Sequence, residues 1–441
     1  MKETVPLPFD ENAQLPVAGA DERAGLATAL VKPAAAYDAL VLDAILRQSL
    51  VSVRSLGSRG LRVASLEAGN KLNSVGTTPT FSSRWNRQKY IAPSYVQSTE
   101  PYLRFLEEVL DQTRARVLIT SSDGTLALVH QHREQLEKRV AIALAKDPAL
   151  AIAINKDQTL AIAAQLGIAI PRGVKVDSAQ DVAAAVKEIG LPAVVKPVES
   201  WLWGELQSAR LTCKLVTSAD EARQAVEELT RLGGSTLFQQ FLTGRREAVS
   251  LLYARGEFYA RFAQWASRTN PQLGGTSVLR QSIAIPPDIG EQSERLVRAI
   301  DLEGYSEIEY RRDNHGTPYL MEINPRLSAS IEVAVRAGVD FPYLLYQWAN
   351  GDRIDVVKGY REGGWMRYLE GDFLTTAEAV LQRGRPGVAP PTQAILAFFL
   401  SFFKPMSYDY LDWRDPLPVW TATTAFMNLL VRHLRRKGSH A

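Results

Sequence analysis

Apolar runs alternate with amphipathic stretches along the chain once the first 36 residues are passed. Short apolar runs predict strands, and longer stretches with a period near 3.6 residues predict helices. In the first third of the chain these patterns predict, in order, a strand over 39–42, a helix over 44–56, a strand over 61–66, a helix over 102–113 and a strand over 116–120. Strands separated by helices predict a parallel sheet. Ser122 and Asp123 follow the last strand, at the edge where open parallel sheets bind ligands.

In the middle of the chain, predicted helices again alternate with predicted strands. Further along the chain, the pattern predicts a hairpin of two strands. The patterns predict a helix over 155–166, a strand over 193–196, a helix from Ser218 to residue 232 and a strand over 236–241. Ser218 suits a helix N-cap, and the two acids soon after it suit the first helical turn. Strands over 307–311 and 319–324 are separated by the turn sequence Asp-Asn-His-Gly, which predicts a hairpin.

The composition narrows the class of protein. The 441 residues are 46% hydrophobic and 22% charged, which is an ordinary globular mixture in a chain long enough for about two to four domains. A net charge of +3 is too balanced to predict a nucleic-acid partner. The single cysteine, Cys213, excludes a disulfide scaffold and a cysteine-built metal site. The chain starts without a signal-peptide pattern, and its longest apolar run, 394–403, is too short to span a membrane, so we expect a cytoplasmic protein.

The predicted hairpin brings oxygen ligands together. Glu322 and Asn324 are two residues apart on a strand and therefore share one face. If the turn is centred between residues 315 and 316, positions equidistant from that point lie opposite each other, and Glu309 then faces Glu322. Two close carboxylates repel each other and need a cation, and with an amide oxygen they suit a Mg²⁺ ion that bridges phosphates. A surface hairpin with solvated acids shows the same pattern.

Basic residues near this hairpin favour a phosphate ligand. Arg326 follows the hairpin directly, and its forked donors suit a transferring phosphoryl group. Lys156 starts a predicted helix, Lys196 ends a predicted strand and Lys214 lies on another. One such lysine is more often a solvated surface charge, but three of them upstream of an acidic pair indicate a nucleotide site.

A buried strand with a connector after it supplies candidates for the adenine and ribose. The candidates for the adenine edge are Gln239, Gln240, Phe241 and Leu242, before the connector at Gly244, and Glu247 just beyond is the candidate for the ribose hydroxyls. Plain core packing is the alternative for the apolar members of this group, and a solvated acid is the alternative for Glu247.

In this order the motifs resemble those of the ATP-grasp superfamily over about residues 38–350. The resemblance rests on Asn155-Lys156-Asp157, on Val194-Val195-Lys196-Pro197, on Gln239–Leu242 with Gly244 and Glu247, and on Glu309 with Met321–Arg326. Within the superfamily the chain is most similar to the carboligase group that includes D-aspartate ligase and carboxylate–amine ligases of unknown substrate. That similarity rests on segments such as Ser55-Leu56-Gly57, Ser83-Arg84, Gly274–Arg280 and Asp412–Pro416.

The resemblance implies a three-lobed ATP-grasp architecture, α/β and α+β in class, with an N-terminal parallel α/β (pre-ATP-grasp) lobe and an additional C-terminal helical tail. The expected parts are a leader over 1–36, the N-terminal lobe over 37–150, the small or lid lobe over 151–240, the metal-binding lobe over 241–352 and a C-terminal extension over 353–441.

It also implies an ATP-dependent carboxylate–amine ligase that forms an amide through an acyl phosphate and releases ADP and phosphate. The cofactors are then ATP and Mg²⁺, with Mn²⁺ as a substitute, and the partners are a small carboxylate and an amine. Carried over to this chain, the resemblance implies that Glu309, Glu322 and Asn324 bind the metal and that Lys156, Lys196 and Lys214 contact the phosphates. It implies adenine contacts for Gln239–Leu242 and a ribose contact for Glu247. It also implies that Arg326 and Arg280 contact the transferring phosphoryl group and that Arg84, Ser122 and Asp123 contact the substrate. A structural ion pair explains Arg84 equally well.

Two positions depart from the family pattern. The expected lid loop over 199–204 holds one glycine and two tryptophans where many relatives are glycine-rich, so this lid closes differently or its tryptophans meet the substrate. The hinge position that is commonly Glu is Gln239, whose amide oxygen still accepts a hydrogen bond from an adenine amino group.

Two other functions share these motifs. A carboxylase or carbamoyl-phosphate type enzyme would activate bicarbonate with the same phosphate chemistry, and a non-catalytic nucleotide-binding protein would keep the site without turnover. The ligase is favoured over the first because no biotin-carrier or glutaminase segment accompanies the motifs, and over the second because the metal ligands and Arg326 are present.

The tail admits two interpretations. The apolar runs over 394–400 and 426–431, followed by basic residues, suit an amphipathic surface that touches a membrane. Packing on the third lobe or across a homodimer interface gives the same pattern, and we favour it because buried helices commonly show such runs.

Overall fold

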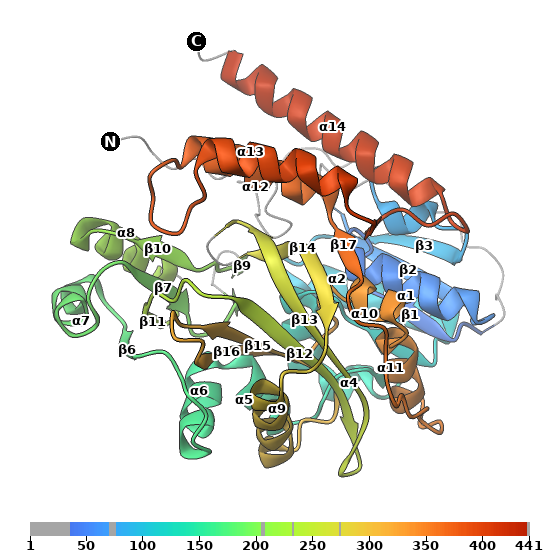
Figure 1. The fold of residues 1–441 in the computed structure, drawn as a ribbon. Coiled ribbons are helices and arrows are strands. Elements are labelled where there is room, and N and C mark those ends of the chain that lie inside the picture. Colours follow the sequence, from blue (N-terminus) through green and yellow to red (C-terminus); the bar gives the residue numbers. More distant parts are fainter. Residues whose placement is uncertain (1–35, 70–75, 204–207, 232, 273–274, 439–441) are drawn as a thin grey trace.

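The structure is a computed structural model that describes residues 36–441 except 70–75, 204–207, 232, 273–274 and 439–441. The predicted leader over 1–36 therefore lies almost entirely outside the described residues. The rest of the chain forms a parallel sheet, a small antiparallel sheet and a large sheet, with helices of the tail lying over them (Figure 1).

The N-terminal sheet is parallel throughout, as the sequence predicts, and has the strand order β3-β2-β1-β4-β5. Its strands are β1 (Ala39–Val41), β2 (Val63–Ala68), β3 (Asn86–Ala92), β4 (Val117–Ile119) and β5 (Ala141–Ile142). The helices between them are α1 (Arg47–Ser58), η1 (Pro79–Ser82), α2 (Thr99–Thr113), α3 (Asp123–Gln131) and α4 (Arg133–Leu136). The carboxyl ends of β1 and β4 meet at Asp43, which accepts hydrogen bonds from the backbone N–H groups of Ser121 and Ser122.

The second sheet is antiparallel in all three pairings, with the order β10-β7-β11-β6, and forms a small lobe. Its elements are β6 (Gly173–Val176), η2 (Ala179–Asp181), α7 (Val182–Ile189), β7 (Ala193–Pro197), β10 (Lys214–Val216), α8 (Ala219–Thr230) and β11 (Thr236–Gln240), with a separate hairpin of β8 (Trp201–Trp203) and β9 (Ser208–Arg210). Helices α5 (Ala149–Ile154) and α6 (Lys156–Gln165) precede the small lobe in the chain and pack in the core of the rest of the molecule. Helices α7 and α8 pack on one face of the sheet and enclose a core that is distinct from the cores of the rest of the chain.

The large sheet has seven strands in the order β16-β15-β12-β13-β14-β17-β18. The first six are antiparallel neighbours, and β17 and β18 run parallel. The elements are β12 (Arg246–Ala254), β13 (Glu257–Asn270), β14 (Thr276–Ile283), α9 (Pro287–Ile300), β15 (Gly304–Arg312), β16 (Pro318–Asn324), α10 (Glu332–Ala337), α11 (Phe341–Ala349), β17 (Trp365–Arg367) and β18 (Met406–Tyr408). Two of these strands, β17 and β18, come from the C-terminal extension, so that segment is part of the sheet.

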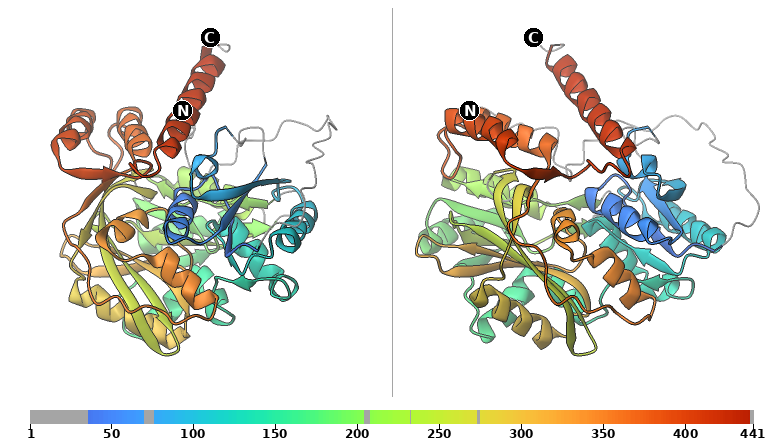
Figure 2. Two further views of the ribbon diagram at one scale, coloured as in Figure 1. Left: turned by 90° about the vertical axis from the view of Figure 1, so that its right-hand side faces the viewer. Right: turned by 45° about the vertical axis from the view of Figure 1, so that its right-hand side comes forward.

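The helices of the tail lie on one side of the molecule. They are α12 (Leu369–Leu381), α13 (Pro391–Leu400), η3 (Ser401–Phe403) and α14 (Leu417–Gly438). Helix α12 packs against β13 and β14, α13 packs on α12, and α14 starts beside η1 of the N-terminal domain and then runs away from the body (Figures 1 and 2). No helix among the described residues has the length and apolar content needed to cross a membrane.

The N-terminal sheet and the large sheet share continuous hydrophobic cores. One cluster joins the β1 face and α1 to α11 and to β12, β13 and β15, through side chains such as Val53, Phe262 and Phe341. Helix α1 contacts α11 directly. The small lobe adds its own core, and Trp201 and Leu237 also join the core of the other parts. The region where the three parts meet, bordered by Lys156 with Glu322 and by Arg210 with Asp123, is called the cleft below.

Local sequence signals position the helices that border this cleft. Asn155 caps α6 by accepting from the N–H of Gln158, and Ser122 caps α3 by accepting from the N–H of Thr125. Both helices therefore begin at the cleft, with Lys156 and Asp123 as their first residues. Ser218 caps α8, as its position before two acids predicts.

Candidate active site

The two candidate metal carboxylates lie opposite each other on neighbouring strands. In the hairpin of β15 and β16, Glu309 pairs with Glu322 and Glu307 pairs with Asn324, so the register predicted from the turn is correct at the site. A register shift follows between Glu309 and Tyr310, and the pairs nearer the turn are offset by one residue. The bulge thus lies between the turn and the site, and all four polar side chains share one face of the sheet.

Each carboxylate is held by a cation of the chain. Arg246 on β12 donates to Glu309 Oε2 through Nε at 3.2 Å and Nη2 at 2.5 Å, and Asn324 Nδ2 donates to Glu309 Oε1 at 3.1 Å. Lys156 Nζ lies 3.3 Å from Glu322 Oε2. These pairings offset the repulsion between two acids that face each other across a strand pair.

Burial and charge act against each other on these groups. Burial lowers the pKa of the Lys156 ammonium, but Glu322, Cys213 and Asp123 together outweigh it and leave that pKa above its ordinary value. Burial raises the pKa of Glu322, and Lys156 and Lys196 reverse this, so the net pKa lies below the ordinary value. Both members of the pair are therefore charged at neutral pH, which is the state that binds a cation and a phosphate.

The small lobe presents a lysine and an amide to the same cleft. Lys196 on β7 is opposite Leu237 of β11, and Gln239 is opposite Val194, so Lys196 and Gln239 share a face. The charges of Glu322, Lys156 and Glu309 act on Lys196, and its burial leaves its pKa below the ordinary value. Gln239 is buried, and its Oε1 has no hydrogen-bond partner in the described structure. An unpaired buried acceptor is costly, so this atom suits a donor from a ligand.

The chain leaves β11 through the predicted hinge. Gln240 ends the strand, and its N–H donates to the carbonyl of Arg172 at 2.9 Å. Phe241 is half-buried and Leu242 is buried in the connector that leads to β12. The connector therefore joins the small lobe to the large sheet just after Gln239.

Asp123 joins the N-terminal domain to the cleft through two arginines. Arg326 Nε donates to Asp123 Oδ1 at 2.5 Å, and Arg210 Nη2 of the β8–β9 hairpin lies 3.3 Å from Oδ2. Burial raises the pKa of Asp123, but Arg326 and Arg210 bring it well below the ordinary value. The Nε and Nη1 atoms of Arg210 are buried without partners in the described structure. Ser122 is tied to Asp43, with its Oγ donating at 3.0 Å, and acts in the structure as the α3 cap.

The expected lid is a short hairpin whose tip, 204–207, lies outside the described residues. Trp201 on β8 is buried, and its ring lies 5.5 Å from that of Tyr95 in the N-terminal domain. Gly124 at the start of α3 leaves room for this ring, because a Cβ there would meet both Trp201 and Tyr95. The tryptophan therefore holds the hairpin against the N-terminal domain, over Asp123.

The structure places two of the expected nucleotide ligands outside this group. Lys214 pairs with Glu228 of α8, with Nζ 3.0 Å from Oε1, because it is opposite Val195 and so faces the helices. Glu247 is buried on the α9 side of the large sheet, where Arg312 Nε donates to it at 2.7 Å and Arg245 Nε at 3.0 Å. Glu247 points away from Glu309 because successive side chains on a strand alternate between its two faces. The preceding residue, Arg246, lies on the face that carries Glu309.

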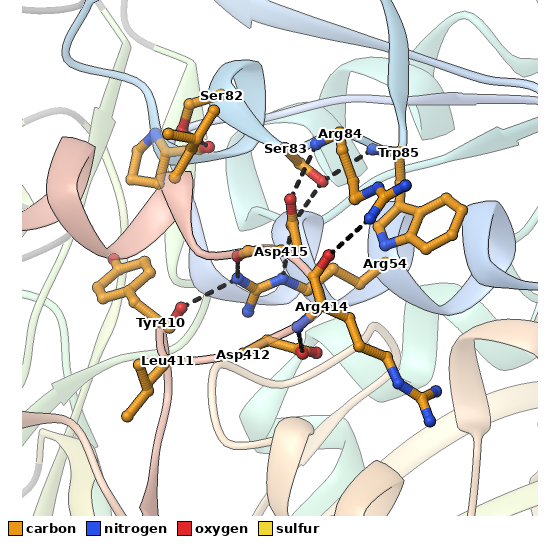
Figure 3. A network of polar contacts seen from close by, with 12 residues as sticks. Arg54, Ser82, Ser83, Arg84, Trp85, Tyr410, Leu411, Asp412, Arg414 and Asp415 are labelled. Carbon is orange, nitrogen blue, oxygen red and sulfur yellow. Dashed lines mark hydrogen bonds and ion pairs between the residues drawn. The ribbon is translucent and has the colours of Figure 1, made fainter.

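The structure also places two expected arginines in a structural network. Arg280 on β14 is fully buried, and its guanidinium donates to Asp409 through Nη1 at 3.0 Å and also through Nη2. Arg84 lies beside the C-terminal loop, where its N–H donates to Asp415 and its Nη1 to the carbonyl of Arg414 (Figure 3). The alternative that explains Arg84 as a structural residue agrees with these contacts.

Sequence reasoning missed three residues of the site. Arg246 shares a face with Glu309 because Ala248, two positions further along β12, pairs with Glu309, and the sequence does not show this pairing of distant strands. Glu307 was assigned only to a strand, although the same period places it beside Glu309. Arg210 gives no signal in the sequence, because its approach to Asp123 depends on how the β8–β9 hairpin packs on α3.

Parts of the chain are similar to a known family and to known proteins. Residues 236–370 match a family model described as ATP-grasp in the biosynthetic pathway with Ter operon. A D-alanine–D-alanine ligase of Nitrosospira multiformis is 26% identical over 194 residues, which cover 41% of this chain and 60% of that ligase. The chain thus matches about three fifths of the length of this relative.

Two solved structures share the fold over most of the chain. A biotin carboxylase from Campylobacter jejuni in complex with an ATP analogue has a TM-score of 0.58 at 14% identity and covers 75% of this chain and 74% of its own. An L-amino acid ligase from Bacillus licheniformis has a TM-score of 0.54 at 18% identity, with 72% and 75% covered. At such identities the likeness concerns the fold alone.

Proposed function

We propose that the chain is an ATP-dependent ligase that joins a small carboxylate to an amine. The proposal is supported by the match of residues 236–370 to an ATP-grasp family model, by the similarity to D-alanine–D-alanine ligases and by the fold shared with an L-amino acid ligase. The carboxylate would take the γ-phosphoryl group of ATP and become an acyl phosphate. The amine nitrogen then attacks the acyl carbon, phosphate leaves with the C–O bonding pair, and the products are an amide, ADP and phosphate.

The residues of the cleft fit Mg²⁺ and ATP. Glu309, Glu322 and the amide oxygen of Asn324 are hard oxygen donors on one face of a sheet, which is the ligand type that Mg²⁺ prefers. Among the described residues no cluster of three His, Cys, Asp or Glu side chains forms a metal site, so phosphate oxygens and water would complete the coordination. Buried, unpartnered Gln239 Oε1 suits the adenine amino group, and Lys156 and Lys196 suit the phosphates.

When bound, Mg²⁺ would offset the negative charge on the phosphates during transfer. The side chains of the protein would position the reacting groups and exclude water from them. Arg326 would hold the oxygens of the transferring group, with Asp123 fixing the orientation of its guanidinium. Arg210, with two donor nitrogens free, would orient the carboxylate substrate from the lid hairpin. Trp201, whose ring packs on that of Tyr95, would hold that hairpin over the site and so protect an acyl phosphate from hydrolysis.

One observation carries the proposal above the others. Glu309 and Glu322 face each other across β15 and β16, and the cleft lysines Lys156 and Lys196 act on the charge of Glu322. A surface hairpin with solvated acids would not have a buried lysine of another element, Lys156 at the start of α6, 3.3 Å from one of its carboxylates.

The experiment is an ADP-release screen with Mg²⁺ and ATP against carboxylates and amines, singly and in pairs, with bicarbonate as a separate arm. We expect turnover to need both a carboxylate and an amine. Glu322→Ala and Lys196→Ala should lower kcat/KM by at least about 100-fold, because each removes charge stabilisation from the transferring group. Lys214→Ala is the matched control and should leave the rate within about twofold, since this lysine pairs with α8.

Three results would contradict the ligase. Turnover on bicarbonate without an amine would assign the chain to the carboxylase class, whose fold it also shares. Equal losses in Lys196→Ala and Lys214→Ala would mean that the site has been placed wrongly. Tight ATP binding with no turnover on any pair would favour a nucleotide-binding protein.

A further inference from the structure

Exposed apolar side chains are concentrated in the tail. Of the seventeen large apolar residues that are well exposed among the described residues, fourteen lie between Phe373 and Val431. Several are aromatic, and the extreme cases are Phe403 at 85% and Trp413 at 86% exposure. Single exposed apolar residues are ordinary, but a set confined to one segment marks a surface that meets an apolar partner.

These side chains form stripes on the outer faces of two helices. On α13 the exposed residues follow a helical period from Ile395 to Phe399 and on to Phe403, just beyond the helix. The opposite face packs inward, where Phe398 contacts Phe373 of α12 with ring centroids 6.4 Å apart. Helix α13 therefore presents an apolar stripe that its own contacts leave open.

Helix α14 repeats this arrangement. Leu417, Trp420, Met427 and Val431 are exposed at spacings of three, seven and four residues, which places them on one face. The inner face is held to the N-terminal domain at the start of the helix, where Thr421 Oγ1 bonds Ser82 Oγ at 2.9 Å. Helices α13 and α14 lie on the same side of the molecule in all three views (Figures 1 and 2).

The charge of this segment identifies its partner. Neither α13 nor α14 contains an acidic residue. From residue 381 to 438 the sequence has eight basic residues and three aspartates, and two of those aspartates, Asp409 and Asp415, are buried in ion pairs with arginines. The basic residues are Arg383, Arg385, Lys404, Arg414, Arg432, Arg435, Arg436 and Lys437. Arg385 is paired with Glu221, but basic residues outnumber acidic ones in this segment, and its exposed large side chains are apolar and in part aromatic.

We propose that α13, η3 and α14 form a docking face for an anionic lipid surface. Aromatic and aliphatic side chains would enter the boundary between headgroups and acyl chains, and the basic residues would contact the lipid phosphates. A second copy of the chain fits less well, because two positively charged faces repel each other. No described helix is suited to spanning, so the face would lie on the surface of the bilayer.

The test is sedimentation of the full chain with two kinds of vesicle, one of phosphatidylcholine alone and one of phosphatidylcholine and phosphatidylglycerol in equal parts. We expect the protein to pellet with the anionic vesicles, to stay in solution with the neutral ones and to be released by high salt. The proposal does not depend on the catalytic activity, so the measurement needs no substrate.

Paired variants separate the contribution of the apolar side chains to vesicle binding from that of the charged side chains. Phe399→Asp with Phe403→Asp should lower the partition coefficient by roughly tenfold or more, because the apolar stripe is lost. Lys404→Glu with Arg432→Glu should lower it on anionic vesicles by a similar factor. The matched control is Ile91→Asp with Val356→Asp, which makes the same change at exposed residues outside the tail and should bind like the parent chain.

Three outcomes would overturn the proposal. One is absence of binding to anionic vesicles, and another is equal loss in the control pair. The third is a stable dimer in light scattering that Phe399→Asp and Phe403→Asp dissociate, without any vesicle binding, since the face would then be an interface between two copies. Circular dichroism of each variant guards against a result caused by unfolding.

Discussion

Glu307 is the residue of the cleft with the most unusual environment. Burial raises its pKa to about 7, and the neighbouring Glu309 adds to this effect. Its Oε2 accepts hydrogen bonds from Gln264 Nε2 at 2.8 Å and Ser328 Oγ at 2.9 Å. These donors are neutral, so they satisfy the carboxyl oxygen without offsetting a negative charge. The Glu307 carboxyl therefore stays protonated in the folded protein up to about pH 7, whereas in the unfolded chain it loses its proton near pH 4.5.

This raised pKa predicts a loss of stability as the pH rises. The protonated carboxyl stabilises the fold fully below pH 4.5, and this contribution disappears as the pH passes through about 7. Between pH 6 and pH 8, and without divalent metal, the free energy of unfolding should fall by about 1 kcal/mol more in the parent chain than in Glu307→Gln. Denaturant titrations at several pH values measure this, with Glu291→Gln, an exposed residue, as the control. Parallel pH profiles for parent and Glu307→Gln would contradict it.

At the scale of elements, the segment after β18 acts as a strap between two domains. Asp409 accepts from Arg47 of α1 and from Arg280 of β14, so one carboxylate joins the N-terminal domain to the large sheet. Asp415 accepts from Arg54 Nε at 2.9 Å and Ser83 Oγ at 2.7 Å, as Figure 3 shows. The strap therefore ties the N-terminal domain to the large sheet through buried ion pairs.

Breaking the strap should destabilise the whole chain. Asp415→Ala leaves the Arg54 guanidinium buried without its carboxylate, which should lower the free energy of unfolding by about 3–5 kcal/mol. Asp412→Ala, three residues away, is the control, because Asp412 makes only a local turn bond to the N–H of Arg414 and should cost below about 1 kcal/mol. Equal unfolding midpoints for the two variants in urea would show that the strap does not carry stability.

At the scale of the whole molecule, the candidate site exists only between lobes. The hairpin of the large sheet supplies Glu309 and Glu322, the small lobe supplies Lys196 and Gln239, and the N-terminal domain supplies Asp123. Cys213 is exposed at the start of β10, and the charges of Lys196, Glu322 and Lys156 act on its thiol. A nucleotide bound to those lysines would cover it.

The single thiol of the chain therefore reports on the cleft. Labelling of Cys213 by a maleimide should slow by roughly tenfold when Mg²⁺ and ATP are present at ten times their dissociation constant, because the thiol then reacts only in the free fraction. Cys213→Ser should show no labelling, since the sequence has no other cysteine. Protection should vanish in Lys196→Ala and persist in Lys214→Ala. A rate that is unaffected by nucleotide would place ATP elsewhere.

Much of the local structure was predictable because it depends on near neighbours in the chain. Hydrophobic runs located β1, β2, β4, β7 and β11, the pattern over 155–166 located α6, and the cap signal at Ser218 located the start of α8. The turn between β15 and β16 predicted that Glu309 faces Glu322. The bulge was not predictable, but it lies on the turn side of the site and left that pair unchanged.

The sequence by itself determined the chemical types present: two carboxylates and an amide on one strand pair, lysines at the start of a helix and the end of a strand, and an ATP-grasp order of motifs. The tertiary structure alone decided which candidates reach the cleft. Lys214 and Glu247 lie on the far faces of their strands, and Arg280 is neutralised by Asp409, 129 residues away. Local patterns fix which residues alternate along a strand, but which face meets which partner depends on packing between segments far apart in the chain, and no neighbouring residue encodes it.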